Sequence, residues 1–143
     1  MKALVSGSLA AAAVTLVASL AGRRRIGSYA APLNATSHFL WGRRAARRTK
    51  LSWKYTGVGF AANWGASIFW ALFYEKLKGA SPSPERALAT GAAVSALAYV
   101  TDYHVVPRRL TPGFEMRLPN DALAGIYVAL ALALSARDLL GRR

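Results

Sequence analysis

The residues best suited to chemistry lie in the stretch YVTDYHVVPRRLTPGFE, residues 99–115. This stretch brings a carboxylate, a phenol and an imidazole together in Asp102, Tyr103 and His104, and two arginines follow. On an α-helix, Asp102 and His104 are about 200° apart around the axis, so they do not form a catalytic pair by proximity. Metal ligands on one helix need steps of three or four residues, and this segment lacks that spacing.

Any site in this stretch therefore needs residues from other segments, and two interpretations stay open. In the first, Asp102 pairs with an arginine where a helix leaves a membrane, while Tyr103 and His104 anchor at headgroup depth. In the second, Asp102 forms a proton relay or ligand site with His38 or His104, because ionisable groups at membrane depth are functional candidates.

Other catalytic chemistry has little support in the sequence. The chain has no cysteine, which excludes disulfides, thiolate metal sites and cysteine nucleophiles. It has two histidines and no metal-binding spacing, no phosphate-binding loop, no complete dinucleotide-binding loop and no serine nucleophile elbow. We therefore expect a non-enzymatic protein with no catalytic residue, no metal and no cofactor.

The elements that carry these residues are long uncharged segments. Of the 143 residues, 54% are hydrophobic and 17% are charged. Residues 3–22, 55–74, 87–101 and 122–136 contain no charge, and about 20 apolar residues cross a bilayer. The sequence predicts one all-α membrane domain, an integral bundle of four transmembrane helices at about 3–22, 56–76, 84–106 and 121–140.

Several helix ends can be located from local residue types. Ser83 is suited to cap the third helix, with Pro84 at its first position. Pro107 lacks an N–H group, so that helix should stop near Val106. Asn120 or Asp121 is expected to cap the fourth helix.

The first apolar segment permits two interpretations. Lys2 and the small residues Ser19 and Ala21 would suit a cleaved signal peptide. The apolar stretch is longer than usual for such a peptide, and three arginines follow it directly. Because basic residues hold that end in the cytoplasm, we favour an uncleaved first helix with its N-terminus outside.

Basic residues cluster beside the apolar segments and give a net charge of +13. Twelve Lys and Arg fall in the predicted inner loops and seven in the outer ones, which favours both termini outside a cell inner membrane. These charges either fix topology alone or bind anionic lipid; nucleic acid is not the expected partner. The residues predicted to contact lipid headgroups are Arg23, Arg24, Arg25, Arg43, Arg44, Arg47 and Arg48.

The connection over residues 26–54 contains APLNATSHFLWGRRAARR. It predicts a short amphipathic helix that begins near Pro32 and extends, with its basic tail, over about 32–48. We expect this helix to lie on the inner leaflet, with Phe39, Leu40 and Trp41 toward the lipid. A re-entrant segment is the alternative.

Helix packing is expected to use small residues at steps of four, because lipid gives no hydrophobic drive for helix association. On the second helix, a polar face around Asn63 should point into the bundle. Asn63 then either bonds a neighbouring helix or lines a solute path. The small-residue stripes are Gly57, Ala61 and Gly65; Ala87, Gly91 and Ser95; and Gly125, Ala129 and Ala133. The inward face is Gly59, Asn63, Ser67, Trp70 and Tyr74.

Three stretches, PLNATSHFLWG, NWGASIFWALFYE and VPRRLTPGFE, carry a likeness to known proteins. They resemble small uncharacterised multi-pass inner-membrane proteins of bacteria. The resemblance covers most of the chain from about residue 32. It implies a multi-pass inner-membrane location and transfers no catalytic residue.

Two functions follow as expectations. The first is a structural or interaction component that contacts anionic lipid and associates as a homo-oligomer or with a membrane-protein partner. The second is a small transporter or channel subunit with a polar path through Asn63 and Asp102. A membrane enzyme acting on lipid has the least support.

Overall fold

The computed structural model describes residues 1–141, and over this range the chain is all-α, with no strand. The fold class expected from the sequence is correct to this extent. Four long helices carry the architecture: α1 (Lys2–Ile26), α5 (Val58–Lys78), α6 (Pro84–Val100) and α7 (Asn120–Leu140).

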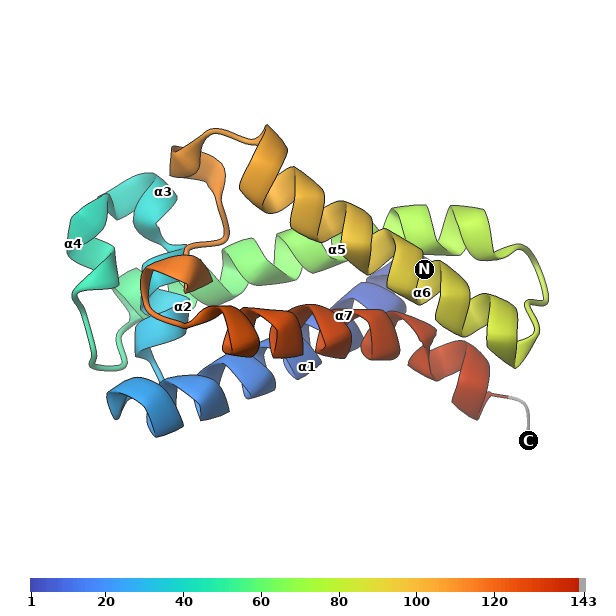
Figure 1. Ribbon diagram of the computed structural model, residues 1–143, viewed down its shortest axis with the longest axis horizontal. Helices are drawn as coiled ribbons and strands as arrows, with labels where there is room; N and C mark the ends of the chain where they lie inside the picture. Colours follow the sequence, from blue (N-terminus) through green and yellow to red (C-terminus); the bar gives the residue numbers. More distant parts are fainter. Residues whose placement is uncertain (142–143) are drawn as a thin grey trace.

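The four long helices run back and forth along the long axis of the molecule (Figure 1). Helix α1 packs extensively against α5 and α7, and α7 also packs along α6. The α5–α6 contact is smaller than these three.

Three short helices close one end of the bundle (Figure 1): α2 (Ala31–Thr36), α3 (His38–Trp41) and α4 (Arg43–Ala46). Every residue of α2 is buried, and α2 packs against α1 and α5. The prediction of an amphipathic helix lying on a surface over 32–48 is therefore wrong for α2. Helix α2 carries no charged residue to keep one side in water, and the exposed arginines of this segment lie instead on α4 and directly after it.

Glycine makes the burial of α2 possible. A Cβ atom at Gly59 of α5 would stand 1.8 Å from the carbonyl oxygen of Leu33. A Cβ at Gly22 of α1 would stand 2.5 Å from the carbonyl oxygen of Ser28. No larger residue fits at either position unless the backbone moves, so the sequence fixes where this segment inserts.

Two π-helical segments flank the long helices: η1 (Trp53–Gly57) before α5 and η2 (Thr101–Val105) after α6. The helical path ends before Pro107, as expected, and the Ser83 hydroxyl accepts the predicted capping bond from the Arg86 N–H at 3.1 Å. The predicted cap on α7 is wrong. Its N-cap is Pro119, and Asp121 pairs with Arg25 instead.

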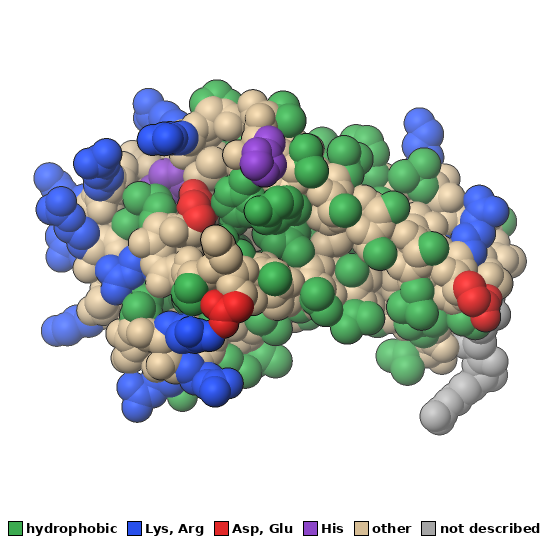
Figure 2. Space-filling model, in the orientation of Figure 1, with side chains coloured by type: hydrophobic (Ala, Val, Ile, Leu, Met, Phe, Trp, Pro, Cys, Tyr) green, Lys and Arg blue, Asp and Glu red, His purple; other side chains and the backbone are tan. Residues whose placement is uncertain are grey.

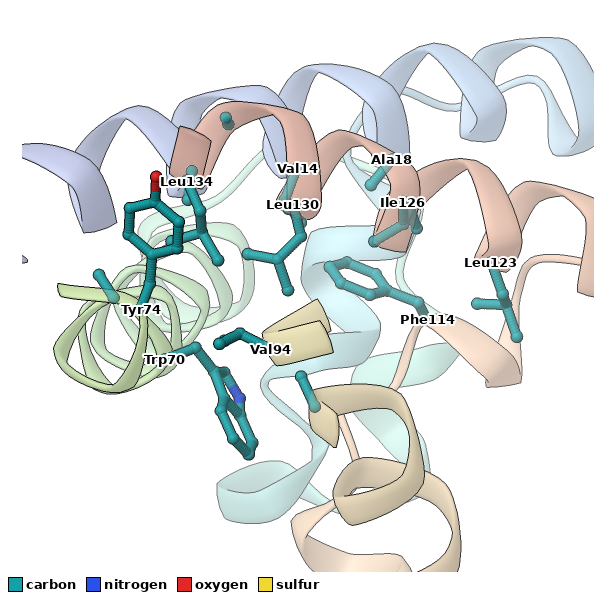
Figure 3. Close-up of a cluster of buried hydrophobic side chains, with 14 of the residues drawn as sticks. Val14, Ala18, Trp70, Tyr74, Val94, Phe114, Leu123, Ile126, Leu130 and Leu134 are labelled. Carbon is teal, nitrogen blue, oxygen red and sulfur yellow. The ribbon is translucent and has the colours of Figure 1, made fainter. Parts of the chain in front are cut away.

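The loop between η2 and α7 folds back over the bundle. It contains two 3₁₀ turns, η3 (Arg108–Leu110) and η4 (Phe114–Met116). Gly113 between them has a φ of 87°, a left-handed conformation that favours glycine. This turn buries Phe114 against α7 near Ile126 and Leu130 (Figure 3).

Large apolar side chains are distributed on the outside as much as on the inside. The interior includes Tyr74, Val94 and Leu134 (Figure 3), together with one buried serine on each of the four long helices. Exposed large apolar residues occur on all four long helices: Leu16 and Leu20, Phe69 and Leu72, Leu88 and Leu97, and Val128 and Leu132. On the face shown in Figure 2, hydrophobic side chains lie along the middle of the molecule, and Lys and Arg lie toward its ends.

The packing predictions have mixed outcomes. The face of α5 that includes Asn63 is buried, as predicted. The stripe Ala87, Gly91 and Ser95 is also buried, and a Cβ at Gly91 would stand 2.6 Å from the Ala131 carbonyl of α7. Ala61 and Gly65 were expected to pack against a neighbouring helix, and this prediction is wrong. Both residues are exposed, because α5 turns its polar face inward instead. The stripe on α7 is half-buried at Gly125 and Ala129 and buried at Ala133.

Two of the long helices, α1 and α7, are long and apolar enough to cross a membrane. This criterion considers length and composition only, and α1 lies near the N-terminus, where a signal sequence also meets it. Helices α5 and α6 do not meet it. The four predicted spans coincide with four helices.

Candidate functional site: a polar cavity beside the basic end

A cavity of about 160 Å³ lies between α5, α7 and the loop that follows α6. Asn63, Ser67 and Trp70 contribute to its wall from α5, and Asp102 from η2. Two of the four residues predicted to form a polar site, Asn63 and Asp102, are therefore brought together. The other lining residues are Val14, Thr36, Phe39, Ala62, Ala66, Leu110, Thr111, Pro112, Phe114, Ile126, Tyr127 and Leu130.

Asp102 is bound by a tyrosine. The Tyr127 hydroxyl of α7 donates a 2.6 Å hydrogen bond to Oδ2 of Asp102. The rings of Tyr99 and Tyr103 lie 5.4 and 6.0 Å from the Tyr127 ring. The predicted pairing of Asp102 with an arginine is wrong within the described residues, because the carboxylate faces the bundle and the nearby arginines face outward.

Asn63 joins α5 to α1. Its Nδ2 donates to the Ala11 carbonyl at 3.3 Å and to the Thr15 hydroxyl at 3.1 Å. The interpretation of Asn63 as an interhelical hydrogen-bonding residue is confirmed. The same side chain also forms part of the cavity wall, so the second interpretation, a solute path, stays a prediction.

Neither histidine lines the cavity. His38 is buried, with Nδ1 3.0 Å from the Ala35 carbonyl oxygen and Nε2 3.0 Å from the Arg108 carbonyl oxygen. His104 is exposed and its ring lies 5.9 Å from that of Tyr99. His38 therefore has a structural role, because its side chain links α3 to the loop after α6. A relay from Asp102 to either histidine has no direct contact to support it among residues 1–141.

The basic residues gather at the end closed by α2, α3 and α4 (Figure 2). The seven arginines predicted to meet headgroups are all exposed there, at the end of α1, on α4 and directly after α4. Arg117 donates to the Ala46 carbonyl at 2.9 Å and Arg109 to the Phe39 carbonyl at 3.2 Å, which ties the two basic loops together. The opposite end has fewer cations, and Arg142 and Arg143, counted there from the sequence, lie outside the described residues.

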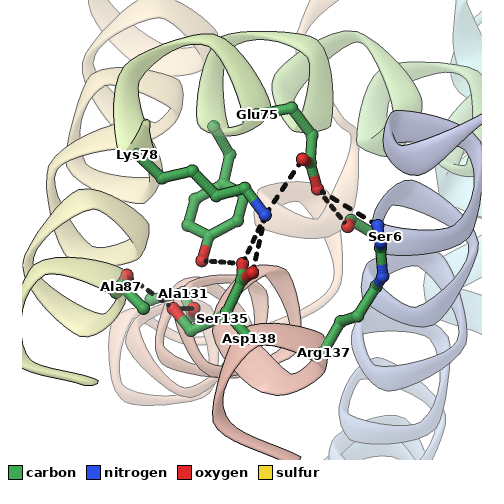
Figure 4. Close-up of polar contacts among 9 residues, drawn as sticks. Ser6, Glu75, Lys78, Ala87, Ala131, Ser135, Arg137 and Asp138 are labelled. Carbon is green, nitrogen blue, oxygen red and sulfur yellow. Dashed lines mark hydrogen bonds and ion pairs between the residues drawn. The ribbon is translucent and has the colours of Figure 1, made fainter. Parts of the chain in front are cut away.

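A buried ionic cluster lies at that opposite end and was missed by sequence reasoning (Figure 4). The Lys78 side chain, whose residue is 3% exposed, reaches both carboxylate oxygens of Asp138 at 2.7 and 2.6 Å. It also lies 3.0 Å from Oε2 of Glu75, while the Ser6 hydroxyl donates to Oε1. The i, i+3 spacing of Glu75 and Lys78 was the available signal; Asp138 comes from a distant helix.

What the cavity can do chemically follows from its wall. It joins one carboxylate, one amide and several hydroxyl groups to an aromatic and aliphatic lining, and no Lys, Arg or His is among the lining residues. Among the residues described, no group of three or more His, Asp or Glu is arranged to hold a metal ion. The wall is suited to binding a small, partly apolar molecule.

Comparison with known proteins gives no relative. No protein-family model, no curated protein and no solved structure matches this chain.

Proposed function

We propose that this protein is a multi-pass inner-membrane protein with four spans, α1, α5, α6 and α7, whose basic end binds anionic lipid at the cytoplasmic face. The proposal makes it a structural or interaction component without enzymatic activity. The observation that carries it is the separation of surfaces: exposed Leu, Phe and Val side chains occur on all four long helices, and Lys and Arg gather mainly at one end of the face shown in Figure 2.

The apolar exterior argues for lipid as the solvent. Soluble monomers rarely expose contiguous apolar patches larger than a few hundred Å², whereas here exposed Leu, Phe, Trp or Val side chains occur on all four long helices. Polar side chains such as Asn63, Ser95 and Ser135 point inward, where they bond other helices. Polar contacts inside and apolar residues outside are the arrangement that a bilayer requires.

The basic end supplies the lipid contact. Exposed arginines from α1 and α4 lie at the same end. The negative potential of a cytoplasmic leaflet attracts such residues, and each contributes about 1 kcal/mol of binding free energy. Within this end, α2 is inserted into the bundle and the chain enters and leaves on one side (Figure 1). That path supports the re-entrant alternative for residues 26–54.

Native mass spectrometry of protein released from membranes tests the lipid contact. Replacing Arg43, Arg44 and Arg47 by Gln should remove about 3 kcal/mol of binding free energy. The affinity for anionic phospholipid should therefore fall roughly a hundredfold, and less of it should be retained. The matched control replaces Lys2, Lys76 and Arg86, three cations of the other end, and should retain the lipid. Equal losses in both variants, or in neither, would reject the proposal. Recovery of the intact chain in the soluble fraction without detergent would reject the membrane location.

A transporter or channel subunit is the second candidate, because Asn63 and Asp102 line the same cavity. The cavity extends along α5 and α7 only as far as Trp70 and Leu130. Beyond them, the fully buried side chains of Tyr74 and Leu134 fill the space between the helices (Figure 3). In proteoliposomes, a transporter should lose flux in Asn63→Ala or Asp102→Asn while remaining folded. A structural component should show changes in stability only.

A further inference from the structure

The six acidic residues of the chain differ in their partners. Glu75, Asp121 and Asp138 form ion pairs with Lys or Arg. Asp102 and Glu115 accept hydrogen bonds from hydroxyl groups instead, those of Tyr127 and Thr111, and neither has an ion pair within residues 1–141. Although the chain has 19 basic residues, neither Asp102 nor Glu115 is paired with one of them in the described part of the chain.

These two carboxylates belong to the same region. Asp102 and Thr111 both line the cavity, and Glu115 is held by the Thr111 hydroxyl. Oε2 of Glu115 is buried and has no hydrogen-bond partner in the described part of the chain. The cavity wall therefore carries the Asp102 carboxylate without a cation, and Glu115 lies behind the wall on Thr111.

The remaining lining is aromatic. Trp70, Tyr127, Phe39 and Phe114 contribute to the wall, and aromatic faces attract cations that have left water. An aromatic wall with one carboxylate and no basic residue favours a positively charged group on an apolar body. It disfavours an anion, although the protein as a whole is strongly basic.

We propose that this cavity binds an organic ammonium group, with Asp102 as its counter-ion and Trp70 and Tyr127 against its apolar substituents. The volume of about 160 Å³ sets the size of the enclosed part. A cavity of about 150 Å³ in another protein accommodates benzene, so one ring or one small quaternary ammonium group fits here. The ammonium group belongs either to a free amine or to the headgroup of an aminophospholipid.

Calorimetric titration of the purified full-length chain in non-ionic detergent tests the site. Benzylammonium is the probe, and benzyl alcohol and benzoate are controls of the same shape with neutral and negative charge. Benzylammonium should bind at one site per chain and more tightly than either control. Asp102→Asn keeps a hydrogen-bond acceptor for Tyr127. It should lower the affinity for benzylammonium by about ten- to a hundredfold, the usual effect of losing a charged partner.

Two further variants keep the test decisive. Asp121→Asn removes a carboxylate outside the cavity and should leave binding unchanged. Ala62→Leu fills the cavity from α5 without changing charge and should abolish binding, even if Asp102→Asn does not fold. Unaltered affinity in either cavity variant, equal binding of benzyl alcohol, or no saturable binding at millimolar benzylammonium would overturn the proposal.

The source of the ammonium group is decided by lipid composition. In nanodiscs that contain phosphatidylethanolamine, a site for an aminophospholipid should show weaker benzylammonium binding than in discs of phosphatidylglycerol alone. A site for a free amine should bind the probe equally in both. Failure of this proposal would leave the lipid contact of the basic end standing, because that contact depends on arginines outside the cavity.

Discussion

Gly59 of α5 lies directly against the backbone of Leu33 in α2, with no space for a side chain between them. This contact seats the buried segment α2 in the end of the bundle, and α2 in turn supplies Thr36 to the cavity wall. The absence of a side chain at Gly59 therefore allows α2 to pack against α5.

Gly59→Ala should destabilise the protein by about 1–3 kcal/mol or more, because the new Cβ meets a backbone atom that cannot rotate away. Gly65→Ala on the same helix has nothing within 4 Å of its Cβ and should be neutral or stabilising by up to about 1 kcal/mol. Thermal unfolding in detergent, followed by circular dichroism, compares the two. Similar melting temperatures for both variants would contradict the seating of α2 against α5.

Lys78→Met should be strongly destabilising. It removes the cation that lies between Glu75 and Asp138 and leaves two carboxylates in a buried cluster, at a cost of about 3–5 kcal/mol. The exposed Lys76→Met is the control, and its unfolding temperature should stay near that of the wild type. The double variant Lys78→Met with Asp138→Leu should recover part of the loss, since it also removes the carboxylate that loses its Lys78 partner, while Glu75 keeps Arg137 at 3.8 Å. A Lys78→Met protein as stable as Lys76→Met would show that the cluster contributes nothing.

His38→Phe should weaken the contact between α3 and the loop after α6. A phenyl ring has no N–H and cannot donate a hydrogen bond to the carbonyl of Ala35 or of Arg108, and a lost hydrogen bond costs about 1 kcal/mol. Limited digestion with trypsin should become faster after Arg108 and Arg109, which are exposed and lie next to this contact. The exposed His104→Phe serves as the control and should be digested at the wild-type rate. Identical digestion of both variants would argue against a structural role for His38.

Single cysteines should report the orientation, because the native chain has none. Arg44→Cys lies in exposed α4 at the basic end, and Ser81→Cys lies in the exposed turn between α5 and α6. With the basic end in the cytoplasm, a membrane-impermeant maleimide should label Cys at 81 in intact spheroplasts and Cys at 44 only after permeabilisation. Labelling of both positions from the same side would exclude four spans.

The positions of the four long helices follow from the sequence because uncharged runs and capping residues are local signals. The runs begin and end where charges, Ser83 or Pro107 stand, and these residues act on their own backbone. The inward face of α5 was also predictable, since an amide such as Asn63 is costly against lipid and must find a partner inside.

The partners of the charged and buried groups were decided by tertiary structure. Asp102 joins Tyr127 and not an arginine, Lys78 reaches Asp138 across 60 positions, and α2 is inserted where an amphipathic helix was expected. Residue type tells which groups need a partner, because burial without one is costly. Which partner each group meets depends on how helices distant in the chain pack together, and periodicity along one helix contains no information about that.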